Sequence, residues 1–189
     1  MANKHILIVP GDGIGQEVTT VGKKVLDKIA AKFGHTFTYD EALIGHVAIE
    51  ATGNPLPDES LEKMRNSDAV LFGAVGHPKY DNDPSAKVRP EQGLLKMRKE
   101  LGLYANIRPI KLFDELLGAS SIKPEILKGA DILFFRELTG DIYFGEKGRK
   151  NNGDTAFDVA EYSRYEVERI ARKAFDAART RRKKLCSVD

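Results

Sequence analysis

The chain has 189 residues, 41% of them hydrophobic and 31% charged, which is the composition of an ordinary folded protein with room for one core, or for one domain and part of another. Its 30 basic and 28 acidic side chains leave a net charge of only +2, so the charge gives no indication of a nucleic acid or membrane partner. One cysteine cannot form an internal disulfide, and the sequence has neither a signal-like N-terminus nor the run of about 20 apolar residues that a membrane span needs, so we expect a cytoplasmic protein.

The first predicted elements are a buried strand at residues 5–9, a glycine turn, and a helix over residues 17–33. A nucleotide-binding βαβ unit begins in the same order. The glycines at 11, 13 and 15 do not have the G-x-G-x-x-G spacing, however, because the sixth position is Gln16. The turn either packs the strand against the helix or contacts a cofactor through Ile14, and the sequence leaves both open.

The next elements are a weakly alternating strand at residues 36–39 and a helical turn at residues 47–51. A helix capped by Asp58 or Ser60 follows them. The apolar run at residues 68–73 then predicts a strand that ends in glycine. Open α/β sheets place ligand loops at such strand ends.

The segment 74–88 has no apolar periodicity and is predicted to be that loop. It carries His77, which a search for motifs would select as a catalytic base. A lone histidine in a loop is usually solvated, so the residues alone do not favour this role.

The segment 89–109 is predicted to open as a helix at Arg89-Pro90 and is closed by Pro109. Leu94 and Leu95 share one helix face with Arg98, and Arg108 adds a second guanidinium ten residues later. A small molecule with carboxylates at one end and a branched alkyl group at the other fits such a set. The alternative is an amphipathic helix with its apolar stripe in a core and its arginines in water.

A buried strand is predicted at residues 131–135, with Arg136 directly at its C-terminal end. We expect this arginine on the ligand side of a parallel sheet, beside Arg98 and Arg108. Tyr143 follows seven residues later, and spacing alone favours an aromatic that packs on a strand.

The C-terminal part is predicted to contain an exposed turn at residues 145–153, an extended segment at 156–162, and a helix that begins with a capping box from Ser163 to Glu166. The helix is expected to bury one apolar stripe, consisting of Val167, Ile170, Ala171, Ala174, Phe175 and Ala178. The basic cluster that ends it is expected to be solvated. Cys186 is expected to be inert in a short buried strand.

Four sequence blocks, in this order, resemble one known family. They are Gly11-Asp-Gly-Ile-Gly15, then Gly73-Ala-Val-Gly76 with Pro78-Lys-Tyr-Asp81 behind it, then the segment 89–109, then Arg136-Glu-Leu-Thr-Gly140 with Ile142-Tyr-Phe-Gly145 behind it. With these blocks the chain resembles the 3-isopropylmalate dehydrogenases of the isocitrate/isopropylmalate dehydrogenase family over essentially its whole length. Four blocks at matching spacing are far more specific than a lone glycine motif.

The resemblance implies an α/β fold of two domains with a mostly parallel sheet, incomplete because the C-terminal half of the family fold is absent. Residues 1–103 would belong to the first, cofactor-side domain, and residues 104–189 to the second, which carries substrate and dimerisation surfaces. An arm near residues 141–162 would pair with the same arm of a second subunit, giving a homodimer.

The resemblance also implies an activity, which is the NAD-dependent oxidative decarboxylation of (2R,3S)-3-isopropylmalate to 2-oxoisocaproate in leucine biosynthesis. Three arginines would grip the substrate, namely Arg98, Arg108 and Arg136. Leu94 and Leu95 would meet its isopropyl group, and Tyr143 would be the catalytic proton donor. The cofactor would lie near Ile14, His77, Pro78 and Glu91.

Other parts of the family site would lie beyond Asp189, including a catalytic lysine and the aspartates that bind Mg²⁺ or Mn²⁺. The chain is therefore expected to be a fragment or a truncated product that is inactive alone. Two leucines argue against isocitrate, which carries a third carboxylate. They leave open tartrate or another alkylmalate, since one or two methylenes change affinity by only ~1–3 kcal/mol. A non-catalytic module that dimerises or binds a ligand is the alternative from another class.

Overall fold

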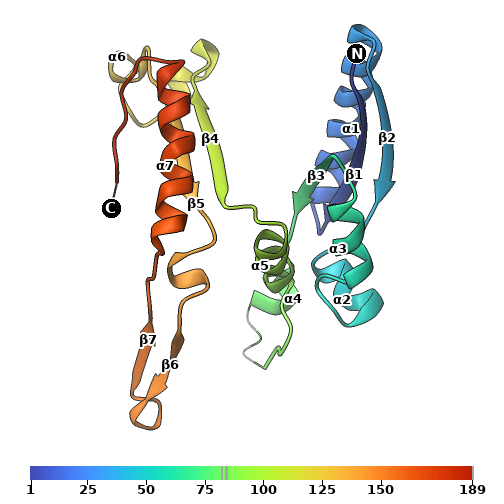
Figure 1. Cartoon of the computed structure of the whole chain (residues 1–189), viewed down its shortest axis with the longest axis vertical. Coiled ribbons are helices and arrows are strands. Elements are labelled where there is room, and N and C mark those ends of the chain that lie inside the picture. The colour runs from blue at the N-terminus through green and yellow to red at the C-terminus, as the bar shows by residue number, and fades with distance from the viewer. Residues whose placement is uncertain (82, 84, 189) are drawn as a thin grey trace. The chain divides into compact units, whose positions relative to one another are not determined.

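The computed structural model of the chain describes residues 1–81, 83 and 85–188 (Figure 1). The chain forms two compact units, Met1–Leu101 and Gly102–Asp189. The mixture of helices and strands, with a parallel sheet in the first unit, confirms the predicted α/β class. The roles predicted for residues 1–103 and 104–189 stay predictions.

The first unit is built on a parallel sheet with the strand order β2-β1-β3. Its strands are β1 (Asn3–Gly11), β2 (Thr36–Glu41) and β3 (Ala69–Ala74). Ile6 in the central strand pairs with Tyr39 on one side and with Ala69 on the other. The run at residues 6–9 is buried, as its continuous apolar sequence predicts for a strand between two neighbours.

Five helices belong to this unit, and they are α1 (Gly15–Phe33), α2 (His46–Thr52), α3 (Asp58–Arg65), α4 (Pro78–Asp81) and α5 (Pro90–Glu100) among the described residues. The prediction that Asp58 or Ser60 caps α3 is wrong. Pro57 is the N-cap residue, and neither side chain caps the helix, because Asp58 already lies inside the first turn. The predicted loop 74–88 contains the single turn α4.

The core of the first unit lies between the sheet and the residues that follow β2, together with helix α5. Its buried members are Leu7, Val9, Ala42, Ile44, Leu56, Leu61, Met64 and Met97. Leu94 of α5 is partly buried and packs against this cluster. The strands β1 and β3, which end in the two loops, are therefore held in place by a packed core.

Helix α1 contacts the sheet through its small residues. Gly15 and Thr19 are buried there, and a Cβ on Gly22 would lie 3.3 Å from the side chain of Leu71. Its apolar stripe faces away from the sheet, with Val21 58% exposed and Val25 52% exposed. The close approach of helix and strand depends on the glycines, because any side chain there would push the helix outward.

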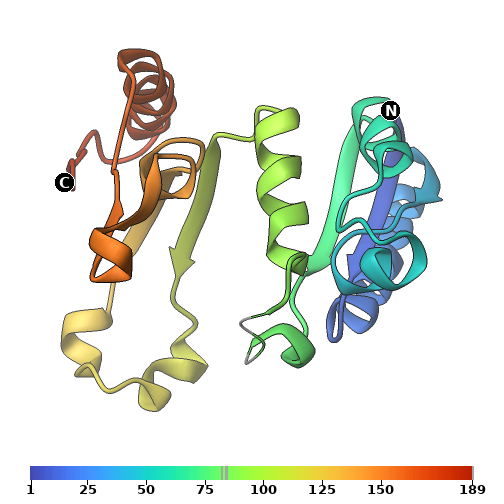
Figure 2. The same ribbon diagram turned by 90° about the horizontal axis from the view of Figure 1, so that it is seen from below.

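The second unit is built on an antiparallel pair, β4 (Ala105–Lys111) and β5 (Asp131–Glu137). The prediction of a buried strand in a parallel sheet is wrong for β5. The strand pairs with β4 in the antiparallel direction, and Ile132 and Phe134 are about half exposed, at 47% and 50%. The segment between the strands forms two short helices, η1 (Asp114–Ala119) and α6 (Pro124–Leu127), and Figure 2 shows it looping out beyond the strand ends.

A hairpin and a long helix complete the second unit. The hairpin pairs β6 (Lys147–Lys150) with β7 (Thr155–Asp158) through η3 (Asn151–Gly153), and η2 (Asp141–Tyr143) precedes it. Helix α7 (Arg164–Arg179) contacts β5. Its predicted capping box is confirmed, since the Ser163 Oγ accepts from the N–H of Glu166 and the Glu166 carboxylate accepts from the N–H of Ser163.

Two predictions at the C-terminal end are wrong. Val167 and Phe175 of the α7 stripe are more than half exposed, while Ile170 and Ala174 are half-buried. The stripe is wider than the face that β5 covers. Residues 185–188 form no strand in the described part of the chain, and Cys186 is exposed, because no neighbouring strand pairs with this segment.

Candidate functional site

The glycine turn after β1 and the loop after β3 lie at the same edge of the parallel sheet, because the two strands are neighbours and run in the same direction. The N–H of Asp12 donates to the carbonyl of Ala74 over 2.7 Å, which ties the two loops together. This edge is where an open α/β sheet exposes backbone groups to a ligand.

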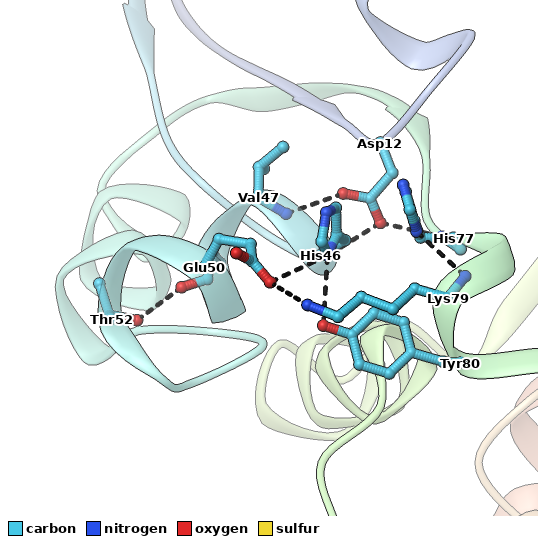
Figure 3. A network of polar contacts seen from close by, with 10 residues as sticks. Asp12, His46, Val47, Glu50, Thr52, His77, Lys79 and Tyr80 are labelled. Carbon is cyan, nitrogen blue, oxygen red and sulfur yellow. Dashed lines mark hydrogen bonds and ion pairs between the residues drawn. The ribbon is translucent and has the colours of Figure 1, made fainter. Parts of the chain in front are cut away.

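The carboxylate of Asp12 joins three segments at this edge, and Figure 3 shows its contacts. Asp12 is 2% exposed and accepts from the backbone N–H groups of His46 (2.9 Å), Val47 (3.1 Å) and Gly76 (2.9 Å). Two of these donors open helix α2, whose positive end favours a carboxylate. A Cβ on Gly45 would lie only 2.3 Å from Asp12 Oδ2, so glycine makes the approach possible.

Next to Asp12, two histidines stack on each other. The ring centroids of His46 and His77 are 3.9 Å apart with an interplanar angle of 28°, and the ring of Tyr80 meets both edge-on. His46 Nδ1 lies 3.2 Å from the Tyr80 hydroxyl, and His77 Nδ1 lies 3.2 Å from the N–H of Lys79. The expectation that His77 is a lone solvated histidine is wrong, because His46 arrives from a distant segment to pack on it.

An ion pair borders the stacked histidines. Lys79 Nζ donates to Glu50 Oε1 over 2.6 Å, and His46 Nδ1 lies 3.8 Å from the same oxygen. The hydrogen bond and charge of Lys79, with smaller contributions from His46 and His77, lower the pKa of the Glu50 carboxyl below its usual range. Glu50 therefore stays negative next to the imidazoles at any pH near neutrality.

The four residues predicted to contact a cofactor all lie in segments at this edge. Ile14, in the glycine turn, is 59% exposed, and Pro78 is exposed while His77 is half-buried. Glu91 lies in the first turn of α5, and a Cβ placed on Gly76 would lie 3.4 Å from its Oε1. Their contact with a cofactor stays a prediction, but the structure describes them as parts of one unit around two glycine loops.

Helix α5 carries three of the predicted substrate residues. Leu94, Leu95 and Arg98 are each half-buried. Leu94 packs against the core cluster of the first unit, so part of its role is structural. Leu95 is not among the residues described as packing against this core, so its side chain is the better candidate to contact a substrate.

The second unit brings Arg108, Arg136 and Tyr143 to one face. Asn106 lies directly opposite Arg136 across the antiparallel pair, and Arg108 lies two residues further along the same strand. Alternate residues of a strand share a face, so both guanidiniums project from the same side of the pair. The Nε of Arg108 donates to the Asn106 side-chain oxygen, and Arg136 Nη2 donates to the Tyr143 hydroxyl over 2.7 Å.

Tyr143 is held toward Arg136 by an unusual turn. Asp141 has a φ of 64°, in the left-handed region that most side chains avoid, and it opens the short helix η2. The Arg136 guanidinium lies 5.4 Å from the centre of the Tyr143 ring. Because the hydroxyl oxygen accepts from Arg136, the phenolic proton remains available for a partner outside the pair.

A polar cluster anchors β5 immediately after Arg136. The Glu137 carboxylate is 7% exposed and accepts from the N–H groups of Thr139 (2.6 Å) and Gly140 (2.8 Å), from the Thr139 hydroxyl, and from Arg169 Nη2 of α7 (2.7 Å). Burial raises the pKa of the Glu137 carboxyl, but these hydrogen bonds outweigh it and leave the pKa below its usual range. The end of β5 that carries Arg136 is thereby tied to α7 through Glu137, whose side chain points to the opposite side of the strand pair.

Four residues of the described site were not predicted from the sequence, namely Asp12, His46, Glu50 and Asn106. Asp12 has a readable signal, since it stands between two glycines in a predicted turn; in the structure both Gly11 and Gly13 have positive φ. Asn106 has a weaker signal, which is its spacing of two residues from Arg108.

Neither a metal site nor a membrane span is found in the part of the chain that the structure describes. No group of three or more His, Cys, Asp or Glu side chains there could hold a metal ion. None of the described helices has the length and apolar character to cross a membrane.

Comparison with known proteins gives one consistent result. The sequence model of the family described as isocitrate/isopropylmalate dehydrogenase matches residues 5–189. The chain is 57% identical over 189 residues to the 3-isopropylmalate dehydrogenase of Rhodopirellula baltica and 53% identical to that of Nitratidesulfovibrio vulgaris. These alignments cover 99% and 98% of the chain, but only 52% and 53% of the relatives. The chain thus spans about half the length of the curated relatives it matches.

Solved structures agree with this. A β-decarboxylating dehydrogenase from Thermococcus kodakarensis superposes with a TM-score of 0.65 at 33% identity, covering 94% of the chain and 46% of that protein. Isocitrate dehydrogenase from Methylococcus capsulatus superposes with a TM-score of 0.72 at 28% identity, covering 94% and 48%.

Proposed function

The chain belongs to the isocitrate/isopropylmalate dehydrogenase family, and we propose that it supplies part of the substrate and cofactor sites of an enzyme that oxidises and decarboxylates (2R,3S)-3-isopropylmalate in leucine biosynthesis. The relatives named 3-isopropylmalate dehydrogenase, at 49–57% identity, support this substrate over others. Since the chain spans about half of their length, the activity belongs to the longer protein, and the 189 residues alone are expected to be inactive.

One observation carries the proposal, which is the face that Arg108, Arg136 and Tyr143 share. Two guanidiniums on one side of the β4–β5 pair suit a substrate with two carboxylates, because each planar fork can hold a carboxylate by two hydrogen bonds. The hydroxyl of Tyr143 is bonded to Arg136, so a substrate that Arg136 binds would lie close to it. Arg98 of α5 is the third proposed carboxylate ligand.

In this mechanism the arginines bind and orient the substrate. Arg136 also holds the Tyr143 hydroxyl in place, so that its proton can pass to the carbon that carried the lost carboxylate and convert the enol to product. Leu95, and Leu94 where it is not committed to the core, would cover the isopropyl group and exclude water. A tartrate or another alkylmalate would use the same arginines and differ only at the leucines.

The proposed cofactor is NAD, which when bound would accept the hydride from the substrate. Gly11 and Gly15 pack the turn against the backbone of Ala74 and Pro10, while a Cβ on Gly13 would meet no atom within 4 Å, so the backbone next to Ile14 is open to a ligand. The proposed cofactor contacts are Ile14, His77, Pro78 and Glu91. The proposed Mg²⁺ or Mn²⁺ does not fit a site within the described residues, so no step is assigned to a metal here.

We further propose a homodimer and a cytoplasmic location. The β6–β7 hairpin, within the predicted arm at residues 141–162, is a two-stranded pair with free edges and little core of its own. Such pairs are marginal in isolation, which supports pairing with a second copy.

The site proposal is tested by titrating 3-isopropylmalate into the chain by calorimetry. Arg136→Lys should weaken binding about tenfold, because an ammonium loses the bidentate fork and the bond to Tyr143. Arg149→Lys, an exposed change in the hairpin, is the matched control. Equal affinities for the two variants would remove Arg136 from the site.

A non-catalytic binding module is the second candidate, and the arginine face supports it equally. Binding of isopropylmalate by the chain without NADH formation is expected under both readings. The two candidate functions are distinguished by supplying the part of the enzyme that the chain lacks, because a dehydrogenase would then form NADH and a binding module would not.

A further inference from the structure

A largely buried ion pair between α7 and the end of β5 lies next to the face that carries Arg136 and Tyr143. We propose that Arg169 of α7 is a positioning residue for Tyr143, because it holds the Glu137 carboxylate around which the turn between β5 and η2 is folded. The consequence for catalysis rests on the proposed function, but the placement of Tyr143 does not.

The turn between β5 and η2 is organised by one side chain. The Glu137 carboxylate accepts from the N–H and the hydroxyl of Thr139 and from the backbone N–H that follows. These bonds fix the direction in which the chain leaves β5. The N–H of Asp141 then donates to the carbonyl of Glu161 over 2.9 Å, which fixes the start of η2. Tyr143 is the last residue of η2, so the turn decides where its ring lies.

Arg136 is placed in another way, since it lies within β5. It is directly opposite Asn106 of β4 in the antiparallel ladder, which extends over the whole strand. Arg136 should therefore keep its place when the turn is disturbed, whereas Tyr143 should not. The hydrogen bond from Arg136 to the Tyr143 hydroxyl thus reports on the turn, because one of its two partners depends on the turn and the other on the strand.

Arg169 holds the Glu137 carboxylate in place. Its Nη2 donates to Glu137 Oε1 over 2.7 Å and also to the Thr139 hydroxyl. Its guanidinium lies over two aromatic rings, 4.5 Å from the ring centre of Tyr104 before β4 and 4.9 Å from that of Tyr165 in α7. The side chains of Arg169 and Glu137 are 17% and 7% exposed. Water therefore has little access to replace the contact.

Removal of the guanidinium would leave the Glu137 carboxylate buried without its cation, which is a costly state. The carboxylate would turn toward water, and the hydrogen bonds that fold the turn would loosen. The turn has little room to adjust in place, because a Cβ on Gly140 would already lie 2.7 Å from Cδ1 of Tyr162. We expect the loosened turn to carry Tyr143 away from Arg136.

The placement of Tyr143 is tested in the chain itself by fluorine NMR. The tyrosines are replaced by 3-fluorotyrosine, and the Tyr143 resonance is assigned by its loss in Tyr143→Phe. Arg136→Ala gives the reference position for a Tyr143 that has lost its hydrogen bond. Arg169→Gln should shift the resonance toward this reference. Arg172→Gln is the matched control, since it makes the same change at an exposed position of α7, and it should leave the resonance in place.

Two milder variants follow the same contact. Arg169→Lys keeps a cation that can reach Glu137 but loses the planar guanidinium, so it should give a smaller shift than Arg169→Gln. Thr139→Val removes the hydroxyl that joins Glu137 to Arg169 while both charges stay, and it should shift the resonance in the same direction. If the amide spectrum of β4 and β5 shows that Arg169→Gln has unfolded, Thr139→Val decides in its place.

The consequence for catalysis is tested with the part of the enzyme that the chain lacks supplied. If Arg169 acts through Tyr143, Arg169→Gln should lower kcat about tenfold and change the KM for isopropylmalate less than about twofold. In a Tyr143→Phe background the same change should cause no further loss, because the residue that it positions has lost its hydroxyl. A merely structural role would lower activity by the same factor in both backgrounds.

An unchanged Tyr143 resonance in folded Arg169→Gln would overturn the proposal, as would an equal shift in Arg172→Gln. Where Thr139→Val decides, an unchanged resonance in that variant has the same meaning. Equal losses from Arg169→Gln with and without the Tyr143 hydroxyl would overturn the catalytic part. An assembled enzyme that forms no NADH in any variant would contradict the proposed function, and the fluorine spectra of the chain would still decide the role of Arg169.

Discussion

Asp12 is the residue on which the sheet edge depends most. Its side chain is buried and accepts from three backbone N–H groups of two other segments, so it joins the glycine turn to both of them. A charged carboxylate can be buried at low cost only when hydrogen-bond donors replace the water it has lost, and here three backbone N–H groups do so.

Asp12→Asn should therefore destabilise the first unit by about 2 kcal/mol or more, because the amide places an NH₂ group against backbone donors. Urea denaturation followed by circular dichroism measures this change. Asp40→Asn, at an exposed position of β2, is the control and should change stability by less than about 0.5 kcal/mol. A similar small effect for Asp12 would mean that the loops hold each other without it.

Glu137 makes the stability of the second unit depend on pH. Its pKa in the folded chain lies below the usual value of 4.5, so its contribution to stability is present above that value and is lost as pH falls through the folded pKa. We expect the urea midpoint to decline on acidification below about pH 4.5. Glu137→Gln should lower the midpoint at pH 7 and flatten this decline.

The control for this prediction is Glu146→Gln, at an exposed position before the hairpin. It should leave both the midpoint at pH 7 and the acid decline unchanged. An acid decline of the same size in Glu137→Gln would show that another carboxyl is responsible.

Among the elements, α5 shows how close packing overrides local preference. Gly93 lies in the middle of the helix, where alanine would normally be favoured by about 1 kcal/mol. A Cβ at this position would lie 2.4 Å from the carbonyl oxygen of Pro55, so the helix can approach that loop only with glycine.

Gly93→Ala should thus destabilise the chain by about 1–3 kcal/mol despite the better helix former. Gly118→Ala is the matched control, because no atom lies within 4 Å of its Cβ position. It should be neutral or slightly stabilising. Thermal unfolding of both variants checks the difference, and a stabilised Gly93→Ala would contradict the packing described for α5.

The elements also show which features can be read from a sequence. The strands β1 and β3, the helix starting at Pro90 and the Ser163–Glu166 cap were all predictable, because their signals are local. The direction of β5 was not, since antiparallel pairing depends on β4, which ends at Lys111, well before β5 begins at Asp131. The same limit hid the stack of His46 on His77, whose partners are 31 residues apart in sequence.

The candidate site was predictable to the level of residue types but not of geometry. The resemblance drew attention to Arg108, Arg136 and Tyr143, and the antiparallel register explains why the arginines share a face. The packing of Leu94 into the core could not be read from its spacing, because a core leucine and a ligand-facing leucine occupy the same helix stripe.

At the scale of the whole molecule, each unit leaves a helix with exposed apolar side chains. On α1 they are Val18, Val21, Val25, Ile29 and Phe33, between 40% and 59% exposed. On α7 Val167 and Phe175 are exposed to a similar extent. In the proposed full-length enzyme we expect these stripes to be covered, since contiguous apolar surface on a stable protein is usually an interface.

The 189 residues are proposed to form the substrate-binding part of an isopropylmalate dehydrogenase. The most direct test joins residues 1–189 to the part of the Rhodopirellula baltica relative that the chain does not match, and measures NADH formation from 3-isopropylmalate with NAD and Mn²⁺. We predict that the chimera forms NADH, that Arg136→Ala and Tyr143→Phe each reduce the rate about 10²-fold or more, and that Tyr165→Phe does not. A folded chimera without activity, or one that Arg136→Ala and Tyr143→Phe leave fully active, would contradict the account.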